Sequence, residues 1–358
     1  MTFRVILYGR GGLTFMNALK TDAVAIAYTS ALTHEEWLEF RKLGIGGSDC
    51  AAVFHQSPFQ TCRDLYYDKI GDEPEIDNDD DNWIAKEYGN CLEDLVGKIF
   101  SRKTGLKIFK EEKMFKHPVH DFMLANVDFF VEENDGSTSI LECKTSSKYM
   151  MDKWSEDSVP LNYELQTRHY MCVLGINKTY IALLTGNNEN DFLYRVIERD
   201  LDFEEDIIKT EKNFWYEHVK KLNPPEYFEN PDLVFQSIKN HFGANKDSTI
   251  QVLEQKYLSN ITEFLDLKNQ KSEIDKLSRN LESKMKNAKN PILEEIKNGL
   301  SATLRTFDRN YFISNKPSKR ESINKESLKK LKLHHPDIYN EYVTETESRN
   351  FKVEVKEN

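Results

Sequence analysis

The stretch NVDFFVEENDGSTSILECKTSS, residues 126–147, decides the fold. Side chains alternate in character from Asn126 to Val131, which predicts a half-buried strand. A second alternating run follows, and it places Glu142 and Lys144 on the same face of the next strand. The Asn-Asp-Gly turn signal between the two runs predicts an antiparallel hairpin.

This hairpin contains an unusual pair of acids. A loop centred on Asp135 places Asp128 directly opposite Glu142, with the two Cβ atoms about 5 Å apart, where like charges repel. A divalent cation between the carboxylates would reverse that repulsion, and Mg²⁺ prefers such oxygen ligands. The other interpretation is an ordinary solvent-facing strand, in which Glu142 and Lys144 form a surface pair. The hairpin alone leaves both interpretations open.

Length and composition restrict the class of protein. The 358 residues suffice for one large domain with an appendage or for two domains, and a hydrophobic content of 39% supports a packed core. Five cysteines without a C-x-x-C pair indicate a reducing cytosol and argue against structural zinc or an iron–sulfur cluster. No apolar run approaches the about 20 residues that span a bilayer, so no membrane partner is expected. The net charge of −11 is concentrated in the acidic stretch 71–82, so it does not exclude nucleic acid.

Helix and strand signals alternate through the first two thirds of the chain. Capping boxes at Thr33 and Thr61 predict two helices, and an apolar stripe from Tyr88 to Ile99 predicts a third. Two further strands (KTYIALLTG and FLYRVIERD) and two further helices (about 163–174 and 202–221) are predicted downstream. The fold class expected is α/β (α+β), with a central mixed sheet flanked by helices.

Composition also predicts how the chain divides. We expect an N-terminal extension over 1–32, in which Met16 is a candidate natural start, and a core domain over 33–221. A linker is expected over 222–245, because it includes the proline-rich stretch LNPPEYFENP. Residues 246–358 are expected to form a helical arm and a small α+β module. The predicted parts of that module are a strand over 302–313, a helix over 326–342 and a closing strand over 351–355.

A third acid lies on the predicted helix over 83–104. Gly89, Glu93 and Gly97 are four residues apart and share one helix face. Each glycine costs about 1 kcal/mol relative to alanine inside a helix, so a close approach of backbone or ligand is expected there. Packing against the sheet would also explain the glycines. Gln166 and Tyr170 are likewise four apart, on the helix that follows the Glu-x-Lys strand.

The order of these motifs resembles the PD-(D/E)xK restriction-endonuclease-like nuclease core, and more narrowly the YqaJ viral recombinase family, which is similar to lambda-type exonucleases. The motifs that carry the resemblance are GIGGSD, YGNCLEDLV, LANVDFFV, ILECKTSS and ELQTRHYM, within residues 33–220. The stretch SLKKLKLHHPDIYNEYVTETESRNFKV, residues 327–353, also resembles the ending of YqaJ-type chains. One departure is Asn126-Val127, where the family often has a proline near the first acid.

The resemblance implies roles for these residues. Asp128, Glu142 and the backbone carbonyl of Cys143 would hold Mg²⁺, for which Mn²⁺ could substitute, and Glu93 would complete that metal site or a second one. Lys144 would orient or deprotonate the attacking water, with its pKa lowered by the nearby cations. Supporting roles for that lysine and for the scissile phosphate would fall to Gln166 and Tyr170.

The GIGGSD motif has two interpretations. It reads as a turn between helices, with Ser48 as the N-cap of the second helix. The resemblance adds a phosphate site, in which Gly46 and Gly47 expose backbone N–H groups and Arg41 with Ser48 binds a terminal 5′-phosphate.

The function expected from the resemblance is a Mg²⁺-dependent, 5′-to-3′ double-stranded DNA exonuclease that leaves 3′ single-stranded tails for recombination. An endonuclease on the same core, such as a nickase or junction resolvase, is the alternative, followed by a non-catalytic DNA-binding module. Expected partners are duplex DNA ends, a single-strand annealing protein and two further copies of the chain in a homotrimer. The expected location is the cytoplasm of a bacterial host that carries a phage or prophage gene.

Overall fold

The computed structural model describes residues 19–72, 83–243, 252–319, 322–343 and 353. The chain divides into two units after Gly243, and each is described by itself. No helix in the described part of the chain has the length and apolar character needed to cross a membrane.

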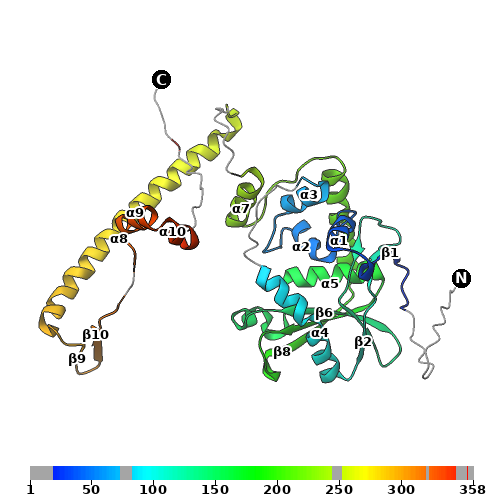
Figure 1. Ribbon diagram of the computed structural model, residues 1–358, viewed down its shortest axis with the longest axis horizontal. Coiled ribbons are helices and arrows are strands. Elements are labelled where there is room, and N and C mark those ends of the chain that lie inside the picture. The colour runs from blue at the N-terminus through cyan, green and yellow to red at the C-terminus, as the bar shows by residue number, and fades with distance from the viewer. Residues whose placement is uncertain (1–18, 73–82, 244–251, 320–321, 344–352, 354–358) are drawn as a thin grey trace. The chain divides into compact units, whose positions relative to one another are not determined.

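A five-stranded mixed sheet forms the centre of the first unit (Figure 1), with the strand order β2-β5-β6-β7-β8. Strands β6 and β7 are parallel, and the other neighbours are antiparallel. The strands are β2 (Lys107–Phe109), β5 (Phe129–Glu132), β6 (Thr138–Thr145), β7 (Lys178–Leu184) and β8 (Phe192–Glu198). The predicted mixed sheet and the strands at β7 and β8 are confirmed.

The predicted hairpin is the pair β5–β6. Its register pairs Phe129 with Leu141, so the next position along places Asp128 opposite Glu142, as expected. Strand β5 begins at Phe129 and not at Asn126, because the residues just before it belong to a strand of another sheet. There β4 (Leu124–Ala125) pairs with β3 (Lys113–Lys116).

The smaller sheet corrects the predicted N-terminal extension. Its order is β1-β3-β4, and β1 (Val24–Tyr28) pairs antiparallel with β3. Thr21 also donates a hydrogen bond to the carbonyl of Leu174 at 2.6 Å. The fold of the first unit therefore includes part of the segment 1–32, while residues 1–18, with Met16, lie outside the described residues.

Helices cover both faces of the central sheet. Helix α4 (Trp83–Thr104) buries Val96 and Phe100 in a cluster with β5, β6 and β7. Helix α5 (Leu161–Leu174) packs with α2 (Gly47–Val53) in the larger cluster, which takes Phe130 and Ile140 from the other side of the hairpin. Because side chains alternate along a strand, Glu142 lies on the same side as Ile140, toward α5.

Three other helices complete the predicted set: α1 (His34–Arg41), α3 (Cys62–Ile70) and α6 (Leu201–Asn213), which continues as a π-helical segment, η4 (Phe214–Val219). Both capping boxes are present, at Thr33 and Thr61. The prediction for Ser48 was wrong. Helix α2 begins at Gly47, and the N-cap is Gly46, whose N–H donates to the Asp49 carboxylate at 3.0 Å. Short 3₁₀ segments are η1 (Thr29–Ala31), η2 (Lys148–Asp157), η3 (Glu189–Asp191) and η5 (Gln255–Tyr257).

The segment predicted as a linker packs largely on the first unit. Helix α7 (Pro231–Phe242) occupies half of it. Glu229 accepts a hydrogen bond from the N–H of Cys62 at 2.7 Å and pairs with His55, and the ring of His241 stacks on Tyr67 at 3.6 Å. These contacts hold the proline-rich stretch against α3 and the loop before it, so composition alone misplaced the boundary.

The second unit is built on one long helix, α8 (Leu258–Ile296), which corresponds to the predicted helical arm. The single strand predicted over 302–313 is instead a hairpin of β9 (Ser301–Arg305) and β10 (Asn310–Ser314). The predicted helix over 326–342 is divided at Pro336 into α9 (Lys325–His334) and α10 (Pro336–Tyr342). Apart from Val353, the predicted closing strand lies outside the described residues.

Candidate active site

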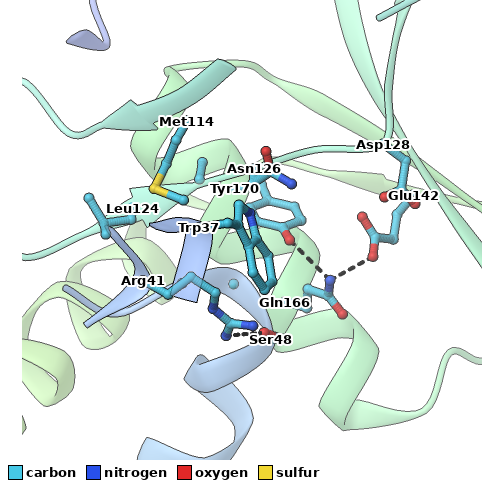
Figure 2. A pocket seen from close by; sticks show the side chains of 13 residues that line it. Trp37, Arg41, Ser48, Met114, Leu124, Asn126, Asp128, Glu142, Gln166 and Tyr170 are labelled. Carbon is cyan, nitrogen blue, oxygen red and sulfur yellow. Dashed lines mark hydrogen bonds between the residues drawn. The ribbon is translucent and has the colours of Figure 1, made fainter. Parts of the chain in front are cut away.

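A hydrogen-bonded row of side chains connects β6 to α5. The Nζ of Lys144 donates to Glu142 Oε1 at 2.7 Å and to Gln166 Oε1 at 3.0 Å. The amide nitrogen of Gln166 donates to the same Glu142 oxygen at 2.6 Å and to the hydroxyl of Tyr170 at 3.1 Å (Figure 2). The structure therefore brings together four of the residues that the sequence singled out.

The acid pair has unsatisfied acceptor capacity. Glu142 is buried, and while its Oε1 accepts two hydrogen bonds, its Oε2 has no partner in the described part of the chain. Asp128 is half-buried, and its Oδ2 accepts from the N–H of Cys143 at 2.7 Å. A buried carboxylate oxygen without a partner is costly. Two carboxylates in this arrangement fit a hard divalent cation.

Electrostatics at the pair agree with this description. Burial, followed by the negative charges of Glu142 and Glu93, raises the pKa of Asp128 well above its usual range. For Lys144, burial lowers the pKa, but attraction by Glu142 and Asp128 outweighs it, so the net pKa is raised. The sequence led us to expect a lowered pKa for Lys144 beside bound cations. In the chain without a cation, the pKa of Lys144 is raised instead.

Glu93 lies close enough to influence Asp128, but its carboxylate is engaged. Lys110 Nζ lies 2.9 Å from Glu93 Oε1 and 2.9 Å from Asp94 Oδ1. Sequence reasoning missed Lys110, since seventeen residues of chain separate it from Glu93 and no pattern connects the two.

The two glycines beside Glu93 have different explanations. A Cβ at Gly97 would lie 2.9 Å from the Phe129 ring, so packing against the sheet requires glycine there. A Cβ at Gly89 would meet only the Thr145 hydroxyl, at 3.7 Å, which is an ordinary contact. The close approach expected at Gly89 is therefore absent among the described residues.

A cationic pocket lies beside this hydrogen-bonded row of side chains. The Nη2 of Arg41 donates to the Ser48 hydroxyl at 2.9 Å and to Asp49 Oδ1 at 2.6 Å, and its guanidinium lies 5.1 Å from the centre of the Trp37 ring. The buried Lys69 donates to the other oxygen of Asp49 at 2.9 Å. Asp49 is thus shared between two cations.

Asp49 and Lys69 are site residues that sequence reasoning did not single out. Burial opposes ionisation of Asp49, but the charges of Lys69 and Arg41 lower its pKa to about 2. An ionised Asp49 holds the Arg41 head group beside Ser48. Asp49 stands inside the GIGGSD motif, so an acid next to that serine was visible in the sequence, although its burial was not. Lys69 gave no signal.

Gly47 lies between the cationic pocket and the hydrogen-bonded row that ends at Tyr170. A Cβ at Gly47 would lie 2.4 Å from the ring of Tyr170, so glycine lets α2 pack directly on α5. A single cavity of about 160 Å³ results. Its lining includes eight residues singled out in the sequence: Arg41, Gly46, Gly47, Ser48, Asp128, Glu142, Gln166 and Tyr170. Figure 2 shows Arg41 and Ser48 on one side of this cavity and the two acids on the other.

A second group with metal-ligating side chains is Cys50, His169 and Glu211, all buried. The two ring nitrogens of His169 face Glu211 Oε1 at 2.7 Å and the Leu124 carbonyl at 2.8 Å. Burial lowers the pKa of His169, but Glu211 outweighs it and raises the net value. A ring that donates from both nitrogens has no lone pair for a metal. We therefore interpret this group as an ion pair that connects α5 to α6.

The resemblance to viral recombinases predicts this arrangement. It consists of two opposed carboxylates and a lysine at the mixed sheet, a glutamine on α5, and the cationic pocket beside them. The chain belongs to the YqaJ-like viral recombinase domain family, whose model matches residues 36–182. The uncharacterized protein YqaJ of Bacillus subtilis (strain 168) is 32% identical over 331 residues, which cover 92% of this chain and 97% of that protein.

Solved structures with some similarity include LHK-Exo in complex with dAMP, at 19% identity and a TM-score of 0.44, with 52% of this chain and 95% of that chain covered. A second is the alkaline exonuclease LHK-Exo from Laribacter hongkongensis, at 18% identity and a TM-score of 0.43, with the same coverage. A third is a phage-related exonuclease from Haemophilus somnus 129PT, at 13% identity and a TM-score of 0.35, with 52% of this chain and 99% of that chain covered.

Asp128→Asn is expected to leave the metal-free protein as stable as the wild type or more so. The pKa of Asp128 is higher in the folded state than in the unfolded chain. The contribution of Asp128 to the free energy of unfolding therefore falls as pH rises from the lower to the higher of these two pKa values. In EDTA at pH 7 the melting temperature should be unchanged or higher by about 2–4 °C. The gain should shrink near pH 4, where the wild-type carboxyl is protonated in the folded state and only partly ionised in the unfolded chain.

Asp135→Asn is the matched control for this thermal-shift measurement. Asp135 lies in the turn of the same hairpin, and hydrogen bonds from Ser137 lower its pKa, so its neutralisation should bring no gain. A clear loss of stability in Asp128→Asn without metal would contradict the repulsion between the two acids.

Proposed function

We propose that this protein is a metal-dependent deoxyribonuclease that degrades one strand of duplex DNA from its 5′ end and leaves 3′ single-stranded tails for recombination. The observation that carries this proposal is the shared cavity. An acid pair that fits a divalent cation and an arginine–serine pair that fits a terminal phosphate line the same 160 Å³ space. Membership of the viral recombinase family supports the same class of reaction.

The residues that would hold the metal are Asp128, Glu142, the backbone carbonyl of Cys143 and Glu93. Their oxygen ligands suit Mg²⁺, with Mn²⁺ as a substitute. The unpartnered Oε2 of Glu142 supports this assignment. A cation held there would neutralise charge on the scissile phosphate and favour ionisation of the attacking water.

Lys144 would position the attacking water. Its ammonium is held between Glu142 and Gln166, so it points along the row toward the acid pair. A bound cation would offset the acidic charge that raises its pKa and so make proton transfer easier. Gln166 acts as a positioning residue, since it contacts Glu142, Lys144 and Tyr170 at once.

Arg41 would bind the 5′-phosphate at the DNA end. Both of its side-chain hydrogen bonds among the described residues come from Nη2, so its remaining donors can serve a phosphate. Ser48 is exposed and adds a hydroxyl, and Gly46 and Gly47 bring the backbone to the cavity wall. Lys69 offsets the charge of Asp49, which would otherwise weaken the attraction of this pocket for an anion.

An endonuclease on the same core is the alternative, and the Arg41–Ser48 pair disfavours it because an endonuclease needs no free end. A non-catalytic DNA-binding module is disfavoured because each position expected to act in hydrolysis carries a suitable side chain. As further parts of the proposal, the protein acts in the bacterial cytoplasm as a homotrimer and passes the tails to an annealing protein.

Incubation with linear and with covalently closed circular duplex, each with Mg²⁺ or with EDTA, tests the proposal. Linear DNA should be degraded only with Mg²⁺, and the closed circle should remain intact. Equal cleavage of both substrates would indicate the endonuclease, and binding without cleavage of either would indicate the non-catalytic module. Gel electrophoresis over a time course distinguishes the three outcomes.

A further inference from the structure

The hairpin β9–β10 of the second unit is basic within an acidic protein. Residues 299–319 contain four basic side chains, Arg305, Arg309, Lys316 and Lys319, against the single acid Asp308, whereas the whole chain has a net charge of −11. Among the described residues only Arg309 has an acidic partner, Asp308 at 3.5 Å, and both side chains are more than 70% exposed. Such an exposed pair is weak, so the hairpin presents positive charge to solvent.

The same hairpin exposes large aromatic rings. Phe307 at its tip is fully exposed, Phe312 on β10 is 81% exposed, and Tyr311 is 46% exposed. Leaving two phenylalanines in water is unfavourable by about 1.5–3 kcal/mol each relative to burial, so such rings together mark an interaction surface. The exposed rings alternate in sequence with the basic residues, a combination that suits nucleic acid better than an apolar protein surface.

Strand register places one ring and one cation on the same face of the hairpin, as diagonal neighbours. Arg305 pairs with Asn310, and Thr303 pairs with Phe312. Because every second residue of a strand faces the same way, Arg305 and Phe312 share one face on neighbouring strands, which lie about 4.8 Å apart. A base could therefore stack on the ring while its phosphate contacts the guanidinium.

The tip of the hairpin is also fixed in shape. Thr306 N–H donates to the Arg309 carbonyl at 2.8 Å, and the Thr306 hydroxyl accepts from the Arg309 N–H at 3.1 Å. At the base of the hairpin, the Asn315 N–H donates to the Leu300 carbonyl at 2.8 Å. Phe307 and Arg309 are thus held on a closed turn, so a ligand that contacts them need not order the backbone first.

We propose that this hairpin is a binding surface for single-stranded DNA. Phe307 and Phe312 stack on bases, and the four basic side chains contact phosphates. The ligand is single-stranded because the base faces of a duplex are already stacked on one another and cannot receive a ring. The choice of DNA rests on the proposed function, whose product is a single-stranded tail, while the charge and stacking arguments stand without it.

The test measures binding of a fluorescent 30-nucleotide oligothymidine to the full chain by anisotropy, in EDTA, so that no cleavage occurs. The double variant Phe307→Ala/Phe312→Ala is expected to raise the Kd about tenfold or more, since stacking on two bases is lost. Its affinity for a blunt duplex of equal length should change less than twofold. Arg305→Ala/Arg309→Ala should weaken binding to both the single strand and the duplex. It should also reduce the slope of log Kd against log salt concentration by the amount expected for about two lost phosphate contacts.

Two controls make the result specific. Phe235→Ala removes a 65% exposed ring from α7 in the first unit and should leave the Kd unchanged. Phe307→Tyr/Phe312→Tyr keeps both rings and should retain binding, while circular dichroism verifies that each variant is folded. Unchanged affinity of the double alanine variant for oligothymidine, or an equal loss for single strand and duplex, would overturn the proposal.

Failure of this proposal is distinguishable from failure of the proposed function. If the protein degrades linear duplex but the double alanine variant binds oligothymidine normally, the hairpin proposal alone is wrong. If the hairpin binds but no DNA is cleaved with Mg²⁺, the nuclease proposal alone is wrong. Selective loss of binding to an annealing protein, with DNA binding intact, would assign the hairpin to a protein partner and overturn the DNA proposal.

Discussion

Glu142→Gln is expected to lower DNA hydrolysis by about a thousandfold or more while the protein remains folded. The substitution keeps the size of the side chain and an oxygen that can accept from Lys144 and Gln166, so the row between β6 and α5 persists. It removes the negative charge and the unpartnered oxygen that a cation would use. Release of nucleotides from linear duplex with Mg²⁺ measures the loss, and isothermal titration with Mn²⁺ should show weaker metal binding.

Lys144→Ala tests the other half of the same site. If Lys144 orients the attacking water or removes its proton, its loss should cost about a hundred- to ten-thousandfold in rate with metal binding retained. Lys148→Ala is the matched control, since Lys148 is an exposed lysine close by on the chain and pairs with Asp191. Near wild-type, metal-dependent cleavage by either Glu142→Gln or Lys144→Ala would remove the proposed active site.

The second large effect concerns the DNA end. Linear duplex with 5′-phosphates is expected to be degraded about ten- to a hundredfold faster than the same duplex with 5′-hydroxyls, because a charge-assisted hydrogen bond contributes about 1.5–3 kcal/mol. Arg41→Ala should abolish the preference by slowing only the phosphorylated substrate. Arg41→Lys should restore little of it, since an ammonium cannot reproduce the paired hydrogen bonds of a guanidinium.

The Arg41→Ala variant should remain folded because Asp49 keeps other partners. When Arg41 is removed, Asp49 keeps its pair with Lys69 and its hydrogen bond from Gly46, so no buried charge is left alone. Lys42→Ala is the matched control, because it removes a positive charge at the end of the same helix and should not alter the ratio of the two rates. An unchanged ratio in Arg41→Ala would show that Arg41 does not bind the end.

Local patterns predicted the hairpin and its acids well. Alternation with a period of two and a turn centred on Asp135 determined the register, so the opposition of Asp128 and Glu142 followed from the sequence alone. The contact of Gln166 with Lys144 was expected from the family resemblance, whereas helix spacing related Gln166 only to Tyr170.

Contacts between elements distant in sequence were the part that could not be predicted. The bridge from Arg41 through Asp49 to Lys69 joins three helices, and no periodicity within one helix reveals it. The linker prediction failed for the same reason, because proline content describes the local backbone and not the partners that Glu229 finds at His55 and Cys62.

The contact between Gly47 and Tyr170 has a consequence for the product of the proposed enzyme. Because α2 meets α5 without an intervening side chain, the proposed pocket for the DNA end packs directly on the helix whose Gln166 is hydrogen-bonded to Glu142. In the proposed enzyme, this packing would fix the distance between the bound DNA end and the bond that is cut. The length of the released fragment should then be the same with Mg²⁺ or Mn²⁺ and at any position along the DNA.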